Sequence, residues 1–270
     1  GFTKNGNTSD RIHVLDMTDG RRWNQIPREI ATRRDFYSAD IPGLEPDWAE
    51  KYLAKIENVH APVRRKIRDT QALPTDELEL DNLLNFVAIT AVRVPKIRKI
   101  MVRPLLESGQ RFLRAIVASP EAFRESNERV GITTPASRAE YEEARTFVES
   151  GEYELDLDQV THLKGLYYGT DLLLKWLSQQ AWSLVIADPA APDFVFTDCP
   201  VVPIHRPRHW QELGIRPRKM PTDIVMPISR RLLLWGLTCR RDIHPPLSAP
   251  TELVLSFNAI IVGQAERYVF

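Results

Sequence analysis

The amino-acid sequence predicts an α+β protein in which a helical body packs on a mostly antiparallel sheet formed largely by the C-terminal third of the chain. Through residue 180, apolar residues recur mainly at helical spacing, behind capping residues. After residue 180, the apolar period changes to two or to short continuous runs separated by prolines and glycines, which is typical of strands. The chain has 270 residues, 43% of them hydrophobic, so it can bury a large core, and we expect residues 1–270 to form a single domain.

Small strands are expected in the first region, residues 1–45. Residues 11–16 alternate between polar and apolar side chains, an Asp-Gly pair then supplies turn chemistry, and residues 22–26 can return as the partner strand of a hairpin. Residues 34–37 are a third strand candidate.

The second region, residues 46–180, is expected to be a helical body. Its helices are predicted over residues 46–69, 75–95, 120–129, 138–149 and 156–180. The helix from residue 75 is apolar almost all round, which makes it the candidate for the central core helix. Pro95 should end or kink that helix, because proline lacks the N–H that a helix interior needs.

The third region, residues 181–270, is expected to hold strands plus one helix. Strands are predicted over residues 182–187, 194–197, 223–226, 232–237 and 266–270, and the helix over residues 250–263. We expect the first four of these strands to form one antiparallel sheet. Pro200 and Pro203 should prevent ordinary ladder pairing just beyond residue 197.

The charge balance limits the classes of partner. The 36 basic and 36 acidic residues leave no net field that would draw the whole molecule to nucleic acid or to an anionic membrane, so polyanion binding must come from a local patch. Two cysteines, Cys199 and Cys239, are too few for a disulfide scaffold or a zinc cage, which favours a cytoplasmic location. No apolar run approaches the roughly 18 residues that span a bilayer, and the first residues do not form a signal peptide.

Asp198 is the leading candidate for chemistry, because it lies at the end of a predicted buried strand. A buried carboxylate needs a cation, a metal or backbone donors, so Asp198 can be a general base or a ligand of a divalent metal. The alternative is a structural turn before Pro200, which aspartate commonly forms. Thr197 precedes it in the same strand end. Cys199 is not a candidate nucleophile, since the neighbouring carboxylate should raise the pKa of its thiol.

Three further polar groups are candidates for the same site. Arg93 lies in the predicted core helix and can pair with Asp198, clamp an anion, or form a structural ion pair. Asn258 lies in an apolar helix and needs hydrogen-bond partners there if it is buried. Glu266 and Arg267 add charges near the end of the sequence.

A basic stretch between two predicted strands, residues 205–219, is the second candidate. Around Trp210 it carries His205, Arg206, Arg208, His209, Arg216, Arg218 and Lys219. Such a segment can bind phosphates while the indole stacks on a base, although charge runs are also common in solvated connections. Pro207 makes a helix unlikely here, so the spacing of the two histidines does not indicate a metal site, and the sequence predicts no metal ligand set.

Several short motifs together resemble an uncharacterised bacterial family, a domain of unknown function. Residues 91–95, Ala-Val-Arg-Val-Pro, are similar to its Ala-Val-Arg-x-Pro motif. Residues 196–200, Phe-Thr-Asp-Cys-Pro, are similar to its Phe-x-Thr-Ser-Asp-x-Pro motif without the serine. The family's His-Tyr-Val-Pro motif is absent from these residues. The resemblance implies one shared pocket formed by Arg93, Thr197, Asp198, Asn258 and Arg267.

Two functional hypotheses follow. The first is a cytoplasmic, hydrolase-like enzyme acting on a phosphate-bearing ligand, either a nucleotide or nucleic acid. In that enzyme Asp198 is the base or metal ligand, Arg93 and Arg267 neutralise developing charge, and the ligand-binding residues are Thr197, His205, Arg206, Asn258 and Glu266. The alternative is a non-catalytic module that binds nucleic acid or a protein through residues 205–219. A third possibility is that all of these charges form structural pairs.

Overall fold

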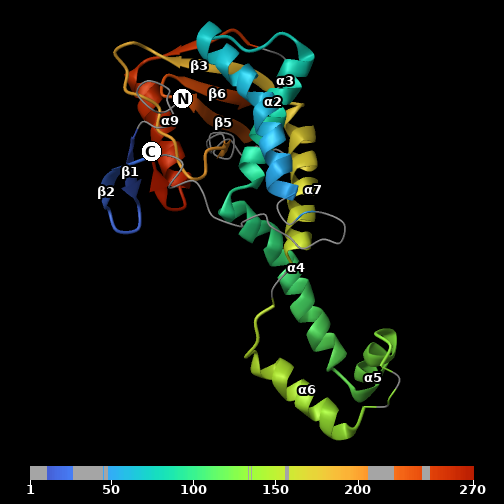
Figure 1. Ribbon diagram of the computed structural model, residues 1–270. Helices are drawn as coiled ribbons and strands as arrows, with labels where there is room; N and C mark the ends of the chain where they lie inside the picture. The colour runs from blue at the N-terminus through green and yellow to red at the C-terminus, as the bar shows by residue number, and fades with distance from the viewer. Residues whose placement is uncertain are drawn as a thin grey trace, which may run out of the picture. The chain divides into compact units, whose positions relative to one another are not determined.

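The computed structural model describes residues 11–26, 45, 48–132, 134, 136–155, 158–205, 222–238 and 244–270. Contacts divide the chain into two compact units (Figure 1). One unit joins Gly1–Ile97 to Leu163–Phe270, and the other is Arg98–His162. The predicted strand at residues 34–37 and Cys239 lie outside the described residues.

A five-stranded sheet forms the centre of the first unit. Its strands are β3 (Ala181–Ala187), β4 (Val202–His205), β5 (Thr222–Ser229), β6 (Leu232–Leu237) and β7 (Leu247–Ala249), in the order β4-β5-β6-β3-β7. Neighbouring strands are antiparallel except for β3 and β7, which are parallel. The prediction of an α+β protein with a mostly antiparallel, C-terminal sheet is therefore confirmed.

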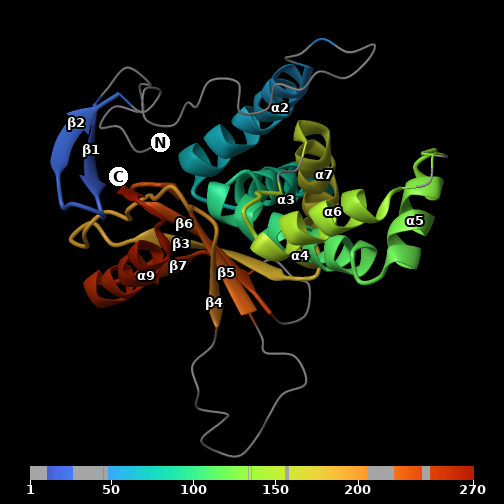
Figure 2. The ribbon, with the colours of Figure 1, turned by 90° about the horizontal axis from the view of Figure 1, so that it is seen from below.

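Both faces of this sheet are covered by helices (Figure 2). Helices α2 (Trp48–Thr70), α3 (Glu77–Val92) and α7 (Gln159–Leu177) contribute apolar residues to the core on one face. Helix α9 (Thr251–Gln264) packs on the other face through Val254, Phe257 and Ile261. The sheet is thus buried on both sides, which explains why its strands read as continuous apolar runs rather than as alternating ones.

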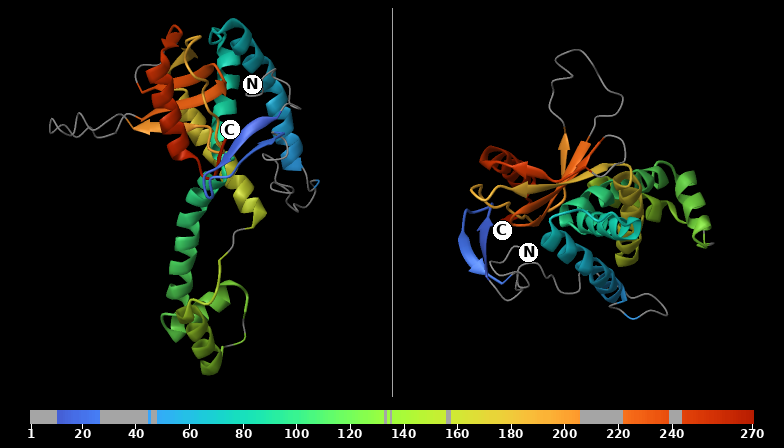
Figure 3. Two further views of the ribbon diagram at one scale, coloured as in Figure 1. Left: turned by 90° about the vertical axis from the view of Figure 1, so that its left-hand side faces the viewer. Right: turned by 90° about the horizontal axis from the view of Figure 1, so that it is seen from above.

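A second, smaller sheet joins the two ends of the described chain (Figure 3). It has the order β2-β1-β8 and consists of β1 (Ile12–Asp16), β2 (Arg22–Gln25) and β8 (Tyr268–Val269). The predicted hairpin of β1 and β2 is confirmed. The predicted final strand pairs with this hairpin, because Tyr268 and Val269 lie opposite Asp16 and Leu15.

Two details of the predicted sheet need correction. Residues 194–197 form no strand of the main sheet; Thr197 makes an isolated bridge to Val269, and Phe196 and Phe270 exchange backbone hydrogen bonds of 3.1 and 2.7 Å. Ladder pairing resumes directly after Pro200, at β4. Pro203 is tolerated there because β4 is an edge strand of the sheet.

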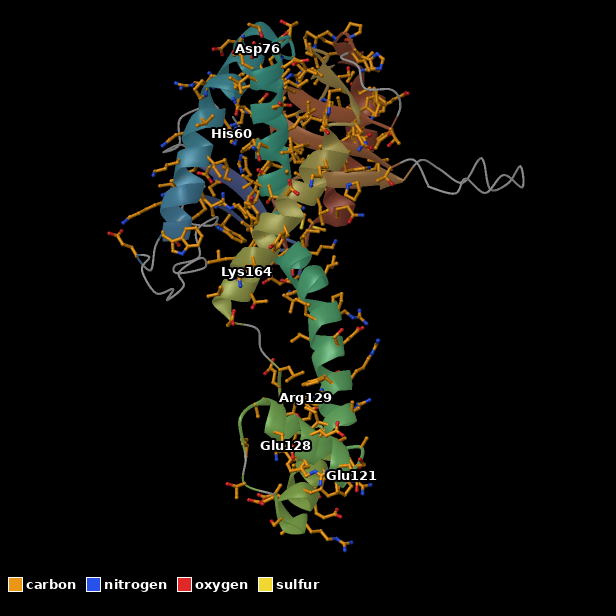
Figure 4. All side chains as sticks on the ribbon, turned by 90° about the vertical axis from the view of Figure 1, so that its right-hand side faces the viewer. His60, Asp76, Glu121, Glu128, Arg129 and Lys164 are labelled. Atoms are coloured by element: carbon orange, nitrogen blue, oxygen red, sulfur yellow. The ribbon has the colours of Figure 1, made fainter. Side chains whose placement is uncertain are left out.

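Three helices account for most of the second unit. They are α4 (Pro95–Ile116), which begins in the first unit, α5 (Pro120–Arg129) and α6 (Arg138–Ser150). Figure 4 labels Glu121, Glu128 and Arg129 on α5. Ser119 and Ser137 cap α5 and α6 as predicted, the latter in a capping box with Glu140. No described helix combines the length and apolar content needed to cross a bilayer.

Helix α4 was not predicted. As expected, α3 ends before Pro95, but Pro95 then occupies the first turn of a new helix, a position where its missing N–H costs nothing. A second proline, Pro104, lies inside α4. Because proline usually interrupts a helix, these two residues led the sequence analysis to miss a 22-residue helix.

Replacement of Gly236 by alanine should destabilise the main sheet. Gly236 pairs with Trp182 across β3 and β6, and an added Cβ would lie 2.8 Å from the indole Cη2. The indole cannot move away freely, because its Nε1 donates to the Leu177 carbonyl oxygen over 3.1 Å. We expect a loss of about 1–3 kcal/mol in the free energy of unfolding, measured by urea denaturation.

Gly263→Ala is the matched control for this substitution. Gly263 lies in α9, and a Cβ there meets nothing within 4 Å. Because alanine favours a helix more than glycine, this variant should be neutral or more stable by up to about 1 kcal/mol. Equal stability of both variants would contradict the packing described for Trp182.

Candidate functional site

The Asp198 carboxylate binds three successive backbone amides near the end of the chain. Its Oδ1 accepts from the N–H of Glu266 over 2.9 Å, and its Oδ2 accepts from the N–H groups of Arg267 and Tyr268 over 2.7 and 3.0 Å. The Asp198 N–H in turn donates to the Tyr268 carbonyl oxygen over 3.2 Å. Both carboxylate oxygens are therefore occupied by backbone donors, which is one of the three solutions that the sequence left open.

Arg267 reaches a different carboxylate. Its Nε and Nη2 each lie 2.9 Å from Oδ2 of Asp16, whose side chain is fully buried at the end of β1. Asp16 also accepts from the backbone N–H and the hydroxyl of Thr18, over 2.9 and 2.5 Å. The hydrogen bond from Arg267, with those from Thr18, lowers the pKa of Asp16 to about 2. The Arg267 guanidinium thus stabilises the small sheet through Asp16 and is not the counter-ion of Asp198.

Thr197 and Cys199 form a closed turn around Asp198. The Thr197 hydroxyl donates to the Cys199 carbonyl oxygen over 3.0 Å and accepts from the Cys199 N–H over 3.2 Å. Thr197 is fully buried. Burial, and secondly the charge of Asp198, raises the pKa of the Cys199 thiol to about 11. The expected increase in the pKa of this thiol is confirmed, although burial is the larger cause.

Asn258 holds α9 to the segment that precedes Asp198. Its Nδ2 donates to the Asp193 carbonyl oxygen over 2.8 Å, and its Oδ1 accepts from the Val195 N–H over 3.0 Å. The amide thereby satisfies two backbone groups of an irregular segment that no sheet ladder could satisfy. Asn258 finds the partners that its place in an apolar helix required.

Arg93 pairs with a carboxylate on the neighbouring helix. Its Nη1 donates to Oε1 of Glu57, so the pair joins the first half of α2 to the end of α3. Among the described residues, no ion pair joins Arg93 to Asp198. Of the residues of the expected pocket, Thr197, Asp198 and Arg267 lie at the small sheet, and Arg93 is bonded to Glu57 of α2.

Lys96 is a polar residue near Asp198 that the sequence analysis missed. It follows Pro95 at the start of α4, and its Nζ lies 3.3 Å from Oε1 and 3.5 Å from the carbonyl oxygen of Gln264. Its charge is close enough to Cys199 to act against the increase in the pKa of that thiol. Only the unpredicted helix α4 brings this ammonium to the end of α9, so no local pattern could have indicated it.

The basic stretch begins at the end of β4. The backbone of His205 pairs with Thr222 of β5, while Arg206 and the rest of the stretch through residue 221 lie outside the described residues. Within the described part of the chain, no group of three or more His, Cys, Asp or Glu side chains could hold a metal ion.

His60 is a buried titratable residue that no sequence motif indicated. It lies on α2 and is 2% exposed (Figure 4), and neither ring nitrogen has a hydrogen-bond partner among the described residues. The imidazole ring of His60 packs against the ring of Phe86 on α3, with 5.8 Å between the centroids. The Arg64 guanidinium carbon lies 4.3 Å from the centroid of the Phe86 ring. Burial, and then the charge of Arg64, lowers the pKa of His60, although Glu57 acts in the opposite direction.

The position of His60 makes stability depend on pH. Because its pKa is lowered in the folded state, the unfolded chain binds a proton that the folded chain does not, and stability falls as the pH decreases below the unfolded value of 6.5. Between pH 7.5 and pH 5.5, His60 should lower the free energy of unfolding of the parent chain by about 1 kcal/mol. The His60→Leu variant should lack this decrease, measured by urea denaturation at each pH.

His13→Gln is the control, because His13 is exposed on β1. It should leave the pH dependence of the parent chain unchanged. A His60→Leu variant that loses as much stability as the parent over this interval would contradict the assignment.

Comparison with known proteins gives a family but no relative with a known activity. No curated protein and no solved structure matches the chain. The model of one family, described as "Protein of unknown function (DUF4238)", matches residues 1–270. The chain therefore belongs to this family of proteins of unknown function.

Proposed function

We propose that this protein is a non-catalytic module that binds single-stranded nucleic acid through the basic stretch, residues 205–219. The observation that supports this proposal most is the pairing of His205 with Thr222. It fixes both ends of residues 206–221 at one end of two adjacent antiparallel strands. A single connection on a rigid, doubly covered sheet is a common place for binding residues.

The chemistry of this stretch suits a phosphate backbone with unstacked bases. Its basic side chains are Arg206, Arg208, Arg216, Arg218 and Lys219, opposed by Glu212 alone. Arginine and lysine neutralise phosphates whatever the base sequence, and Trp210 offers a ring on which a base can stack. Because the whole chain is electrically balanced, such a local cluster is what polyanion binding would require.

The hydrolase hypothesis has less support. It requires Asp198 to act as a base or to ligate a metal, yet both of its oxygens accept backbone hydrogen bonds. Either role would have to compete with the amide donors of Glu266, Arg267 and Tyr268, which already take up three of the roughly four acceptor sites of the carboxylate. Arg93 and Arg267 have acidic partners of their own, Glu57 and Asp16.

The proposal predicts salt-dependent binding that depends on the basic stretch. We expect the full chain to bind a fluorescein-labelled single-stranded oligonucleotide, with affinity falling as salt is added. Replacing Arg206, Arg208, Arg216 and Arg218 together by glutamine should abolish binding or reduce the slope of log K against log salt by about 0.7 for each lost phosphate contact. Fluorescence anisotropy at several salt concentrations measures both quantities.

A second quadruple variant controls for the change in net charge. Arg103, Arg111, Arg124 and Arg129 are exposed and form only surface ion pairs with glutamates, so their replacement by glutamine should leave the fold intact. This variant should bind as the parent chain does. Binding that survives loss of the four arginines of the basic stretch, or absence of any binding by the parent chain, would overturn the proposal.

A further inference from the structure

The second unit contains a cavity of about 500 Å³. The C-terminal ends of α4 and α6 and the segment after α6 border it, with lining residues Gln110, Arg114, Val117, Arg145, Val148 and Tyr153 among others. Both arginines are exposed, so the cavity is open to solvent. Its volume falls in the range of sites for small organic molecules, about 300–1,000 Å³. All lining residues belong to Arg98–His162, so the cavity lies within a single unit.

The walls of the cavity are held in place by local structure. Val117 and Val148 are 7% and 8% exposed, so they form a packed apolar floor. The Tyr141 hydroxyl donates to the Val117 carbonyl oxygen over 3.1 Å and thereby joins α6 to the end of α4. Gly151 ends α6 in the left-handed conformation, with φ of 67°, and turns the chain so that Tyr153 reaches the cavity.

The charged lining residues favour an anion. Two guanidinium groups face the cavity against one carboxylate, Glu149. Arg145 donates from Nε to Oε1 of Glu149 over 2.8 Å, which uses one of its five donors. In the described part of the chain, Arg114 forms no ion pair. It lies in the last turn of α4, where a cation complements the helix dipole, and it still offers its full donor fork to a ligand.

We propose that this cavity binds a small organic acid, in which a carboxylate or phosphate monoester meets Arg114 and Arg145 and an apolar body lies on Val117 and Val148. The Arg145–Glu149 pair orients the second guanidinium, while Gln110 and Tyr153 supply neutral polar groups at the rim. An amine would meet two cations, so the same geometry discriminates against it.

Isothermal titration calorimetry on the full chain tests this site. The probes are hexanoate and hexyl phosphate, with hexylamine and inorganic phosphate for comparison. We expect at least one of the two acids to bind, hexylamine to give no heat of binding, and inorganic phosphate to bind more weakly than hexyl phosphate because it lacks the apolar body. The tighter of the two acids identifies the anionic group.

Substitutions locate the binding to this cavity. Arg114→Gln should weaken binding of the tighter acid by about tenfold or more. Arg114→Lys should weaken binding less, since the charge remains and only the bidentate hydrogen bonding of the guanidinium is lost. Arg111→Gln is the control, because Arg111 is exposed on the same helix and does not line the cavity. Failure of both acids to bind, or equal weakening by Arg114→Gln and Arg111→Gln, would overturn the proposal.

Discussion

One carboxylate, that of Asp198, fixes the backbone on which the small sheet is built. Three successive amides, from Glu266 to Tyr268, converge on its two oxygens. This bends the chain after α9 so that β8 starts at Tyr268, opposite Asp16 of β1. Arg267 is then in place to bind the buried Asp16 carboxylate, for which it is the one cationic partner in the described part of the chain. A hydrogen-bonded turn and a buried ion pair therefore depend on the same side chain.

Several of the candidate site residues hold the backbone in place rather than facing a ligand. Polar side chains in an apolar surrounding need partners, and Thr197, Asp198 and Asn258 each find theirs in the backbone of irregular segments. These segments have no sheet ladder to satisfy them, so the side chains replace it. Groups used in this way have little capacity left for a ligand. Our two proposals therefore concern other parts of the chain, the basic stretch after β4 and the arginine-lined cavity of the second unit.

The sequence predicted elements well where the signals were local. The start of α6 was indicated by the capping box of Ser137 and Glu140, and the start of α5 by the serine before Pro120. The apolar run of β6 indicated that strand. Helix α4 was missed because Pro95 and Pro104 look like helix breakers, although one of them lies at a helix start.

Long-range contacts were less predictable. The sequence analysis grouped Glu266 and Arg267 with Asp198, but it did not predict that their backbone amides make the contact, since an amide 68 positions away carries no side-chain signature. His60 was not singled out in the sequence, because its burial depends on the packing of α2 on α3. The cavity of the second unit could not be foreseen either, because it requires the ends of two helices, one of them the unpredicted α4.

Amide hydrogen exchange of the segment after α9 tests the role of Asp198 most directly. In the parent chain, the amides of Arg267 and Tyr268 should exchange slowly, because Asp198 accepts from both over 2.7 and 3.0 Å. In Asp198→Ala, both acceptor oxygens are removed, so these two amides should lose protection while those in the interior of α9 keep theirs. Rapid exchange of both amides in the parent chain, or unchanged protection in the variant, would contradict the account.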